Sequence, residues 1–347
     1  MSPDRAHAWG MAALAVLERS AWLRQAATMP PDPRLEVRVL GHTFPSPVGI
    51  AGGFDKNGRC PRALAALGFG FVEVGTVTAL AQAPNPSPNL FRLPLDRALI
   101  NRLGFPNDGA EAVAARLRHT LAGKALGVPL AVSIGKSRAV PIEPFEGVLA
   151  DYEASFNAVA EIADVVIVNV SSPNTQGLRA LQSTELAKRL FERLSQRGSA
   201  MGRPVLVKIA PDLSPSELDD VLGVIKESGL SGLVATNTTT QRAGLNTPAE
   251  EVTSIGAGGL SGPPLRERAV GFVRRGRELL GPDAVIIGVG GIEQASHVRA
   301  YLDAGADLVQ LYTGFVYGGP GLPRQLAAEL LRGGTTPLRK RSPVTSC

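Results

Sequence analysis

The sequence predicts an α/β fold, a closed (β/α)8 TIM barrel that follows a small helical extension at the N-terminus. Three observations predict it: short apolar, β-prone runs alternate with helical patterns from residue 34 onward, the runs number eight, and each leads into Gly, Lys, Asn, Ser or Thr. Strands that alternate with helices form parallel sheets through right-handed crossovers, and eight repeats favour a barrel over a doubly wound sheet.

Length and charge limit the possible functions. A chain of 347 residues with 44% hydrophobic residues can form one large barrel, and we expect a helical extension over residues 1–33 and the barrel domain over residues 34–347. The net charge of +5 fits ordinary solubility, or attraction to a phosphate-bearing cofactor, an acidic substrate or an anionic lipid surface. No block of Lys and Arg is long enough to predict a nucleic-acid partner.

Cysteine and histidine usage does not predict a metal or disulfide site. The two cysteines, Cys60 and Cys347, are too few for a disulfide framework or a metal cluster, which fits a reducing cytosol. None of the four histidines falls in a strand-end motif, so we expect no bound metal. No apolar run approaches the roughly 18 residues of a membrane span, and no signal peptide is evident.

The first predicted element is one helix over residues 6–27, ended by the proline-rich segment at residues 29–33. Its apolar side is expected to carry Trp9, Ala13, Val16, Leu17 and Leu23. Such a helix either caps the core or, given Trp22, Arg19 and Arg24, lies on a membrane surface. The residues alone leave both uses open.

The barrel repeat follows. We expect its strands at residues 48–51, 71–76, 130–134, 165–170, 205–209, 232–236, 285–289 and 308–311. We expect its helices at residues 62–67, 109–122, 152–163, 184–197, 216–228, 266–280, 295–304 and 323–331.

Glycine-rich turns follow the last two strands, at Gly290-Gly291 and at Gly314. Turns at these two places are the usual phosphate site of this fold, because backbone N–H groups face the anion there. The glycines between residues 258 and 262 could supply further donors. Any one of these glycines fits a tight turn, but the set favours a phosphate.

Lysines and amides at the strand ends indicate a bound ring. Lys208 and Lys56 are each either paired with a structural carboxylate or placed to stabilise negative charge on a ring such as a reduced flavin. The asparagines suit a flat heterocycle such as a pyrimidine, although each could be a turn residue; they are Asn101, Asn169, Asn174 and Asn237. Ser172 is the candidate base if its proton can be passed on, and otherwise belongs to a plain loop turn.

With these motifs the chain resembles the dihydroorotate dehydrogenases of the quinone-linked class, from about Pro3 to Leu331. The motifs occur in order and are specific: AGGFDK at 51–56, EVGTVT at 73–78, INRLGF at 100–105, NVSSPNT at 169–175, VKIAPD at 207–212, ATNTT at 235–239, GLSG at 259–262 and GVGGI at 288–292.

The resemblance implies a bound FMN, oxidation of (S)-dihydroorotate to orotate in UMP biosynthesis, and a quinone acceptor. It also implies a monomer docked peripherally on the cytoplasmic side of the cell inner membrane through residues 1–33. By position, it implies orotate contacts from Lys56, Asn101, Arg102, Leu103, Gly104, Phe105, Asn169, Asn174, Asn237 and Thr238. It implies FMN contacts from Gly52, Gly53, Phe54, Asp55, Lys56, Thr76, Ser133, Asn169, Lys208, Thr236, Gly262, Gly291, Tyr312 and Thr313.

The resemblance further implies a mechanism. Ser172 would be the catalytic base, taking a proton from C5 of dihydroorotate while C6 delivers hydride to flavin N5, and Phe105 and Thr175 would guide the proton away. Lys56 and the asparagines would favour the enolate-like charge, and Lys208 the reduced flavin. The family usually has asparagine where this chain has Ser133, so that FMN contact is expected to be lost or bridged by water.

Three alternatives predict different residues. A cytosolic dihydroorotate dehydrogenase that uses fumarate or NAD would carry a cysteine in place of Ser172 and no helical extension. A tRNA dihydrouridine synthase would carry a catalytic cysteine and a C-terminal RNA-binding domain, whereas a short basic tail follows Leu331. A flavin- or lipid-binding protein without catalysis would not need Ser172, Lys56 and the asparagines together.

Overall fold

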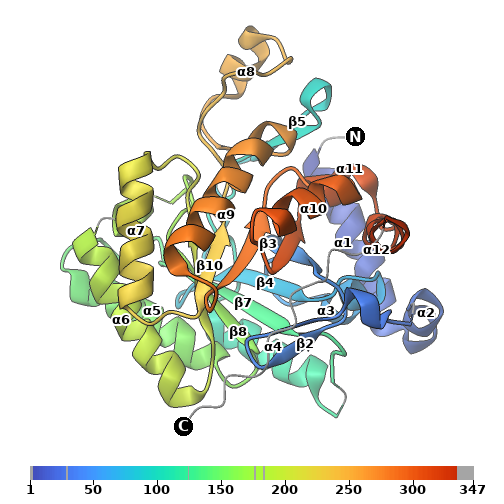
Figure 1. Cartoon of the computed structure of the whole chain (residues 1–347), viewed down its shortest axis with the longest axis horizontal. Helices are drawn as coiled ribbons and strands as arrows, with labels where there is room; N and C mark the ends of the chain where they lie inside the picture. Colours follow the sequence, from blue (N-terminus) through green and yellow to red (C-terminus); the bar gives the residue numbers. More distant parts are fainter. Residues whose placement is uncertain (1–2, 29, 124, 176, 183, 334–347) are drawn as a thin grey trace.

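The structure, a computed structural model, describes residues 3–28, 30–123, 125–175, 177–182 and 184–333. Within these ranges the eight expected strands close into a parallel barrel, which confirms the predicted fold (Figure 1). Around the barrel the order is β10 (Gly232–Ala235), β12 (Val285–Val289), β13 (Leu308–Leu311), β3 (Val48–Asp55), β4 (Val72–Val77), β7 (Leu130–Gly135), β8 (Val165–Asn169) and β9 (Val205–Ile209).

The inside of the barrel is apolar at one end and polar at the other. Residues two apart on a strand face the same side, and the inward residues near the N-terminal strand ends are apolar, as Ile167 and Leu206 are. A hairpin of β1 (Val37–Val39) and β2 (His42–Phe44) closes that end, with Phe44 in the same apolar cluster. The inward polar side chains lie further along the strands, toward their C-terminal ends.

Helices cover the outside of the barrel. They are α3 (Pro61–Ala66), α4 (Ala110–Leu121), α5 (Phe145–Val159), α6 (Thr184–Met201), α7 (Pro215–Glu227), α9 (Arg266–Leu280), α10 (Ala295–Asp303) and α12 (Leu322–Arg332). The expected bounds of α5, residues 152–163, are wrong. The helix begins directly after Pro144, because Phe145 and Val148 are buried and extend its apolar face upstream.

The extension is two helices, α1 (Pro3–Arg19) and α2 (Ala21–Ala27), so the expected single helix over residues 6–27 is wrong. Ser20 separates them and begins α2, since its Oγ accepts a hydrogen bond of 3.2 Å from the N–H of Leu23. An N-cap of this kind has extended backbone and therefore interrupts a continuous helical pattern.

The side of the extension expected to be apolar is not the side that packs on the barrel. Leu14 packs in the core between the strands and the outer helices, and the carboxylate of Glu18 accepts a hydrogen bond of 2.7 Å from the N–H of Ala63 in α3. Trp9 and Val16 of the expected apolar side are 67% and 61% exposed. The extension therefore presents one apolar surface to the barrel and a second to the outside.

A three-stranded antiparallel sheet lies outside the barrel and was not predicted. It consists of β5 (Leu90–Leu93), β6 (Ala98–Asn101) and β11 (Gly259–Ser261). The segment expected as a glycine turn contains β11, which pairs with β6 instead. In Figure 1, β5 and α8 (Ala249–Ile255) lie together at the top of the view. In the ranges described, no helix is long and apolar enough to cross a membrane.

Candidate active site

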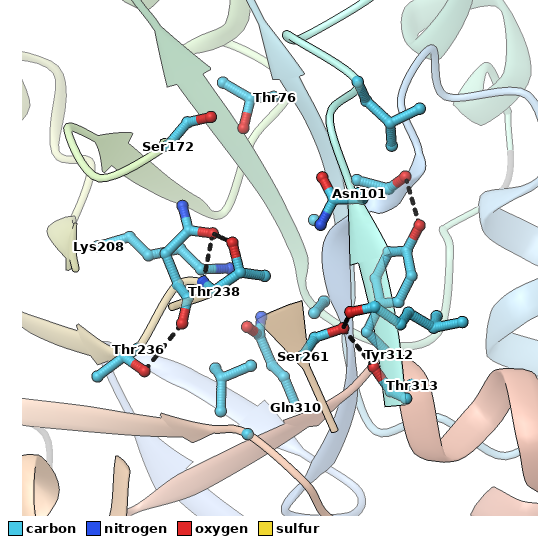
Figure 2. Close-up of a pocket in the computed structure, with 18 of the residues that line it drawn as sticks. Thr76, Asn101, Ser172, Lys208, Thr236, Thr238, Ser261, Gln310, Tyr312 and Thr313 are labelled. Atoms are coloured by element: carbon cyan, nitrogen blue, oxygen red, sulfur yellow. Dashed lines mark hydrogen bonds between the residues drawn. The ribbon is translucent and has the colours of Figure 1, made fainter. Parts of the chain in front are cut away.

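A cavity opens at the C-terminal ends of the barrel strands, and the antiparallel sheet forms part of its wall (Figure 2). It contains about 1040 Å³ of empty space, counting its open mouth. The predicted site residues that line it are Gly52, Gly53, Lys56, Thr76, Asn101, Leu103, Gly104, Phe105, Asn169, Ser172, Asn174, Lys208, Thr236, Asn237, Thr238, Gly262, Gly291, Tyr312 and Thr313. The fold thus brings segments from every part of the barrel to one place.

Two predicted site residues at the end of β3 lie behind the cavity wall. Phe54 points away from the cavity, and its ring makes an edge contact with that of Phe315, with the centroids 5.2 Å apart. The Asp55 carboxylate accepts hydrogen bonds from the N–H groups of Arg59 and Cys60, at 2.9 and 2.8 Å. Both residues shape the turn that carries Lys56.

Two further predicted site residues also lie outside the lining. The guanidinium of Arg102 lies over the ring of Phe91, 4.7 Å from its centroid, on the outer side of the antiparallel sheet. Ser133 is fully buried on β7, where its Oγ lies 2.9 Å from Oγ1 of Thr76. Ser133 therefore supports Thr76, which does line the cavity.

The turns after β12 and β13 bring backbone groups close together at one end of the cavity. A Cβ on Gly291 would lie 2.8 Å from the carbonyl oxygen of Gly262, and one on Gly314 would lie 2.0 Å from that of Ile292. Only glycine allows so close an approach. The hydroxyl of Thr313 adds a polar group at this end. Backbone N–H groups and a hydroxyl in such a concave turn can hold a phosphate.

Four asparagine amides form a hydrogen-bonded frame in the cavity. The side-chain N–H of Asn174 donates to Oδ1 of Asn101 at 3.1 Å, and that of Asn237 donates to Oδ1 of Asn169 at 3.3 Å. Asn169 in turn donates to Oγ1 of Thr76 at 3.0 Å. An amide has two donor hydrogens and two acceptor lone pairs. Asn237 uses its hydrogens and its oxygen on neighbours, since it also donates to Oγ of Ser171 and accepts from the N–H of Thr238. The capacity left for a ring with C=O and N–H groups therefore lies mainly on Asn101, Asn169 and Asn174.

Two lysines bring positive charge to the cavity wall. Lys208 is 5% exposed and points into the barrel from β9, on the same face as Leu206. Burial lowers the pKa of Lys56 to about 8, and the neighbouring Asp55 carboxylate opposes that shift. A lysine with this pKa is mostly protonated at pH 7, so Lys56 can attract an anionic group of a ligand.

Ser172 lies in the loop that follows β8. It is 5% exposed, and its Oγ accepts a hydrogen bond of 3.2 Å from the N–H of Asn174. Thr175, further along the loop, is also buried, and its Oγ1 has no hydrogen-bond partner among the described residues. The serine is therefore held by backbone geometry, without a histidine or carboxylate in hydrogen-bond contact with it in the part of the chain described.

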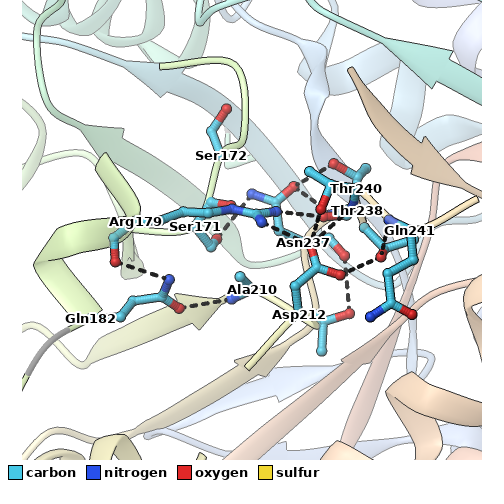
Figure 3. A network of polar contacts seen from close by, with 12 residues as sticks. Ser171, Ser172, Arg179, Gln182, Ala210, Asp212, Asn237, Thr238, Thr240 and Gln241 are labelled. Carbon is cyan, nitrogen blue, oxygen red and sulfur yellow. Dashed lines mark hydrogen bonds and ion pairs between the residues drawn. The ribbon is translucent and has the colours of Figure 1, made fainter. Parts of the chain in front are cut away.

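Arg179 joins the loops that follow β8, β9 and β10 (Figure 3). Its guanidinium donates to the carbonyl oxygens of Ser171 and Thr238, at 3.2 and 3.1 Å, and to the Asp212 carboxylate at 2.8 Å. Burial would raise the pKa of Asp212, but hydrogen bonds, the first from the hydroxyl of Thr239, and the charge of Arg179 lower it below its usual value. The ion pair fixes the peptides next to Ser172 and Asn237.

An aromatic chain connects the extension to the cavity. His7 of α1 makes an edge contact with Phe54, and Phe54 makes one with Tyr312, with centroids 5.7 and 6.0 Å apart. Burial lowers the pKa of His7 to about 4, and the charge of Lys56 adds to the shift, so His7 is neutral at pH 7. This contact could not be predicted from the sequence, because His7 lies outside the barrel repeat.

The cavity has further lining residues that were not among the predicted site contacts. They are Ala51, Leu90, Leu99, Pro106, Ser261, Leu265, Val289, Ile292 and Gln310, and the lining also includes Gly290 and Gly314 of the expected phosphate turns. Gln310 could have been found, because it stands two residues after the inward Leu308 on β13 and therefore shares its face. Leu90 and Leu99 could not, since they come from the unpredicted sheet.

Comparison with known proteins agrees with the site. The profile of one protein family, described as dihydroorotate dehydrogenase, matches residues 34–333. A dihydroorotate dehydrogenase (quinone) of Thermobifida fusca is 49% identical over 320 residues, which cover 91% of this chain and 84% of the relative. One of Clavibacter michiganensis is 50% identical over 334 residues, covering 96% and 95%.

A solved structure agrees as well. The crystal structure of DHODH from Eimeria tenella in complex with ferulenol superposes with a TM-score of 0.83 at 34% identity, and the match covers 95% of this chain and 91% of that one. The structure of the ligand-free type from the same organism gives a TM-score of 0.81. The chain therefore belongs to the dihydroorotate dehydrogenase family.

Proposed function

We propose that this chain oxidises (S)-dihydroorotate to orotate with bound FMN and passes the electrons to a quinone, as a step of de novo pyrimidine biosynthesis. It is an FMN-dependent oxidoreductase of the quinone-dependent class. The observation that carries the proposal is the single cavity in which Ser172, four asparagines and two lysines meet a glycine-lined edge. FMN, when bound, supplies the two-electron redox chemistry, and the protein supplies position and charge.

The residues of the cavity fit FMN. The glycine turns at Gly262 and Gly291 let backbone segments approach one another more closely than a Cβ would allow, and this glycine-lined edge beside the hydroxyl of Thr313 suits a phosphate. Toward the barrel axis the lining includes polar side chains, and Oε1 of Gln310 is buried there without a hydrogen-bond partner among the described residues. We assign the phosphate to the glycine edge and the ring to the side of Lys208, Thr236 and Thr76, as the family resemblance implies.

The amide frame supports the assignment of orotate. Asn101, Asn169 and Asn174 keep donor or acceptor capacity around one space, and Asn237 holds Asn169 in place, which matches a ring with alternating C=O and N–H groups. Burial lowers the pKa of Lys56 to about 8, and an anionic group bound beside it would favour the charged form, so we assign the substrate carboxylate to Lys56. Leu103, Gly104 and Phe105 complete the wall and exclude water.

Ser172 is the proposed base. Its Oγ takes the proton from C5 of the substrate and must pass on its own proton, because a serine is a weak base at its ordinary pKa. Thr175 and Phe105 flank the route we propose for that proton. The buried Oγ1 of Thr175, which lacks a hydrogen-bond partner among the described residues, supports this, since such a hydroxyl can bind a relay water.

A cysteine base is excluded for the described part of the chain. Cys60 is buried at the start of α3 and does not line the cavity. Burial raises the pKa of its thiol far above the usual value, and the Asp55 carboxylate adds to that shift. Cys347 lies outside the described residues. These findings favour the quinone-dependent class over the cytosolic class and over a tRNA dihydrouridine synthase.

We place the protein peripherally at the cytoplasmic side of the inner membrane, as a monomer, with residues 1–33 as the docking segment and residues 34–347 as the catalytic domain. The outward apolar surface of the extension supports this, with Trp9, Val16 and Trp22 exposed by 67%, 61% and 73%. The aromatic contacts from His7 to Tyr312 join the extension to the cavity wall, and we propose that quinone approaches the cofactor on that side.

One experiment tests the function. Purified protein is mixed with dihydroorotate without oxygen, the loss of the oxidised FMN absorbance is followed, and a quinone, fumarate and NAD are then compared as acceptors. We expect rapid FMN reduction and reoxidation by the quinone alone. A protein that cannot take up FMN, or whose FMN is not reduced by dihydroorotate, would refute the proposal, and reoxidation by fumarate or NAD would refute the class.

A further inference from the structure

Glu73 is a buried carboxylate inside the barrel, beside the cavity but not part of its wall. It lies on β4 and is 1% exposed. Lys208 of β9 and Gln310 of β13 meet it inside the barrel: its Oε2 accepts a hydrogen bond of 2.6 Å from Gln310, and its Oε1 lies 4.0 Å from Nζ of Lys208. Both partners line the cavity. Barrels usually fill this space with branched apolar side chains.

The carboxylate is only partly satisfied. Its Oε1 has no hydrogen-bond partner among the described residues, and 4.0 Å is an ion-pair distance beyond the reach of a hydrogen bond. Burying a charge in this way is unfavourable, and an apolar side chain of similar volume would often be more stable. Stability alone therefore does not explain why the position holds a glutamate.

The chain also leaves room for this carboxylate. A Cβ on Gly52 would lie 2.1 Å from Oε1 of Glu73, so any larger residue would displace it. Gly52 lines the cavity on β3. The carboxylate therefore lies directly behind three lining residues, Gly52, Lys208 and Gln310, and its charge acts on whatever they face.

We propose that Glu73 is a positioning residue that holds Lys208 and Gln310 toward the bound FMN and, as the counter-charge of Lys208, lowers the reduction potential of that FMN. The inference rests on the proposed function. Lys208 alone would favour the negatively charged reduced ring. A carboxylate 4.0 Å from Nζ offsets much of that field, because charges interact strongly in a buried environment.

The test is a spectroscopic titration of the FMN potential against a reference dye, which needs no turnover. Glu73→Gln keeps the shape and removes the charge, and we expect its equilibrium to shift at least about tenfold toward reduced FMN, which is about 30 mV for a two-electron couple. Glu73→Asp keeps the charge and should stay near the wild-type potential. No shift in Glu73→Gln, or equal shifts in both variants, would overturn the role of the charge.

Lys208→Met provides the second arm. Its potential should shift in the opposite direction, and Glu73→Gln added to it should change nothing further, because in the proposal Glu73 acts through Lys208, which it positions and whose charge it offsets. Additive shifts in the double variant would show that the two residues act independently and would overturn the inference.

If Glu73→Gln does not bind FMN, Gln310→Met offers a second test. It keeps the carboxylate of Glu73 but removes the hydrogen bond that Gln310 donates to it. It should shift the potential in the same direction by less, and an unchanged potential would count against the proposal. The wild-type protein distinguishes failure of the proposed function from failure of the role of Glu73. A wild-type protein that binds no FMN refutes the proposed function, whereas a normal wild type with unresponsive variants refutes only the role of Glu73.

Discussion

The two sides of the cavity are held in place by different means. The strand side lies on or directly after barrel strands, and the backbones of these strands hydrogen-bond into a closed barrel. It consists of Thr76, Lys208, Thr236 and Gln310. The loop side, made of Ser172, Asn174 and Thr238, lies on segments beyond the strands, where Arg179 and Asp212 tie the loops together. The pairing of a closed barrel does not depend on any single side chain, whereas the loop side depends on side-chain contacts, among them the ion pair of Arg179 and Asp212.

This difference matches the proposed chemistry. FMN stays bound through the reaction cycle and needs a rigid binding site, which the strand side offers. Dihydroorotate must enter and orotate must leave, so the residues around the substrate need loops that can open. We therefore expect changes on the loop side to act on substrate oxidation alone, and changes on the strand side to act on FMN itself. The predictions below test that separation.

The largest effect is expected for Ser172→Ala. A positioned base contributes about 10²- to 10⁴-fold to the rate, so reduction of FMN by dihydroorotate should slow by at least about 100-fold. FMN content and reoxidation of pre-reduced FMN by quinone should stay at wild-type values, because Ser172 acts only on the substrate. Stopped-flow measurement of each half-reaction checks this. Wild-type reduction in the variant would remove Ser172 from the mechanism.

Arg179→Ala should come next. It removes hydrogen bonds to the carbonyls of Ser171 and Thr238 and leaves Asp212 buried without its cation. Hydrogen bonds to charged groups are worth about 1.5–3 kcal/mol, so kcat/KM for dihydroorotate should fall by about 10- to 100-fold.

The FMN potential should not move in Arg179→Ala, which separates loop positioning from a disturbed barrel. Arg193→Ala is the matched control, since Arg193 pairs with Glu153 on the exposed face of α6. It should match the wild type in both measurements. A lowered FMN affinity in Arg179→Ala would show that the two sides are not independent.

The strand side was also the more predictable from sequence. Lys208 could be placed because Leu206 and Lys208 alternate within an apolar run, and the barrel order follows from eight repeats. Arg179 could not, since its three contacts join loops that are distant in sequence. The split at Ser20 and the sheet from β5 to β11 were missed because capping and tertiary pairing overrode the local pattern.

A pH profile should give a smaller effect. Burial holds the pKa of Lys56 near 8, below the 10.5 of an ordinary lysine, so Lys56 loses its proton above about pH 8 in the free protein. Between about pH 8 and 10.5, Lys56 keeps its proton in the unfolded chain but has lost it in the folded chain. The contribution of Lys56 to the free energy of unfolding therefore rises with pH over this range.

Substrate binding should change in the opposite sense, because the carboxylate of dihydroorotate requires the protonated lysine. We expect kcat/KM to fall above about pH 8, by up to about tenfold per pH unit. Lys56→Arg keeps its charge to higher pH and should remove that fall while the FMN potential stays unchanged. An identical profile in the variant would assign the titration to another group.

The smallest effect is expected at the extension, which belongs to neither side of the cavity. Deleting residues 1–30 would also remove Leu14 from the core, so substituting the exposed surface is the cleaner test. Trp9→Ser with Trp22→Ser removes apolar area that would otherwise be buried in lipid. Binding to anionic vesicles should weaken, the more so at high salt, and KM for a long-chain quinone should rise several-fold. KM for a short, water-soluble quinone should not change, nor should reduction by dihydroorotate.

Met201→Ser, on an exposed apolar residue at the end of α6, controls for general loss of apolar surface. If the double variant binds vesicles and uses the long-chain quinone as the wild type does, the extension is a cap on the barrel and quinone reaches FMN by another route.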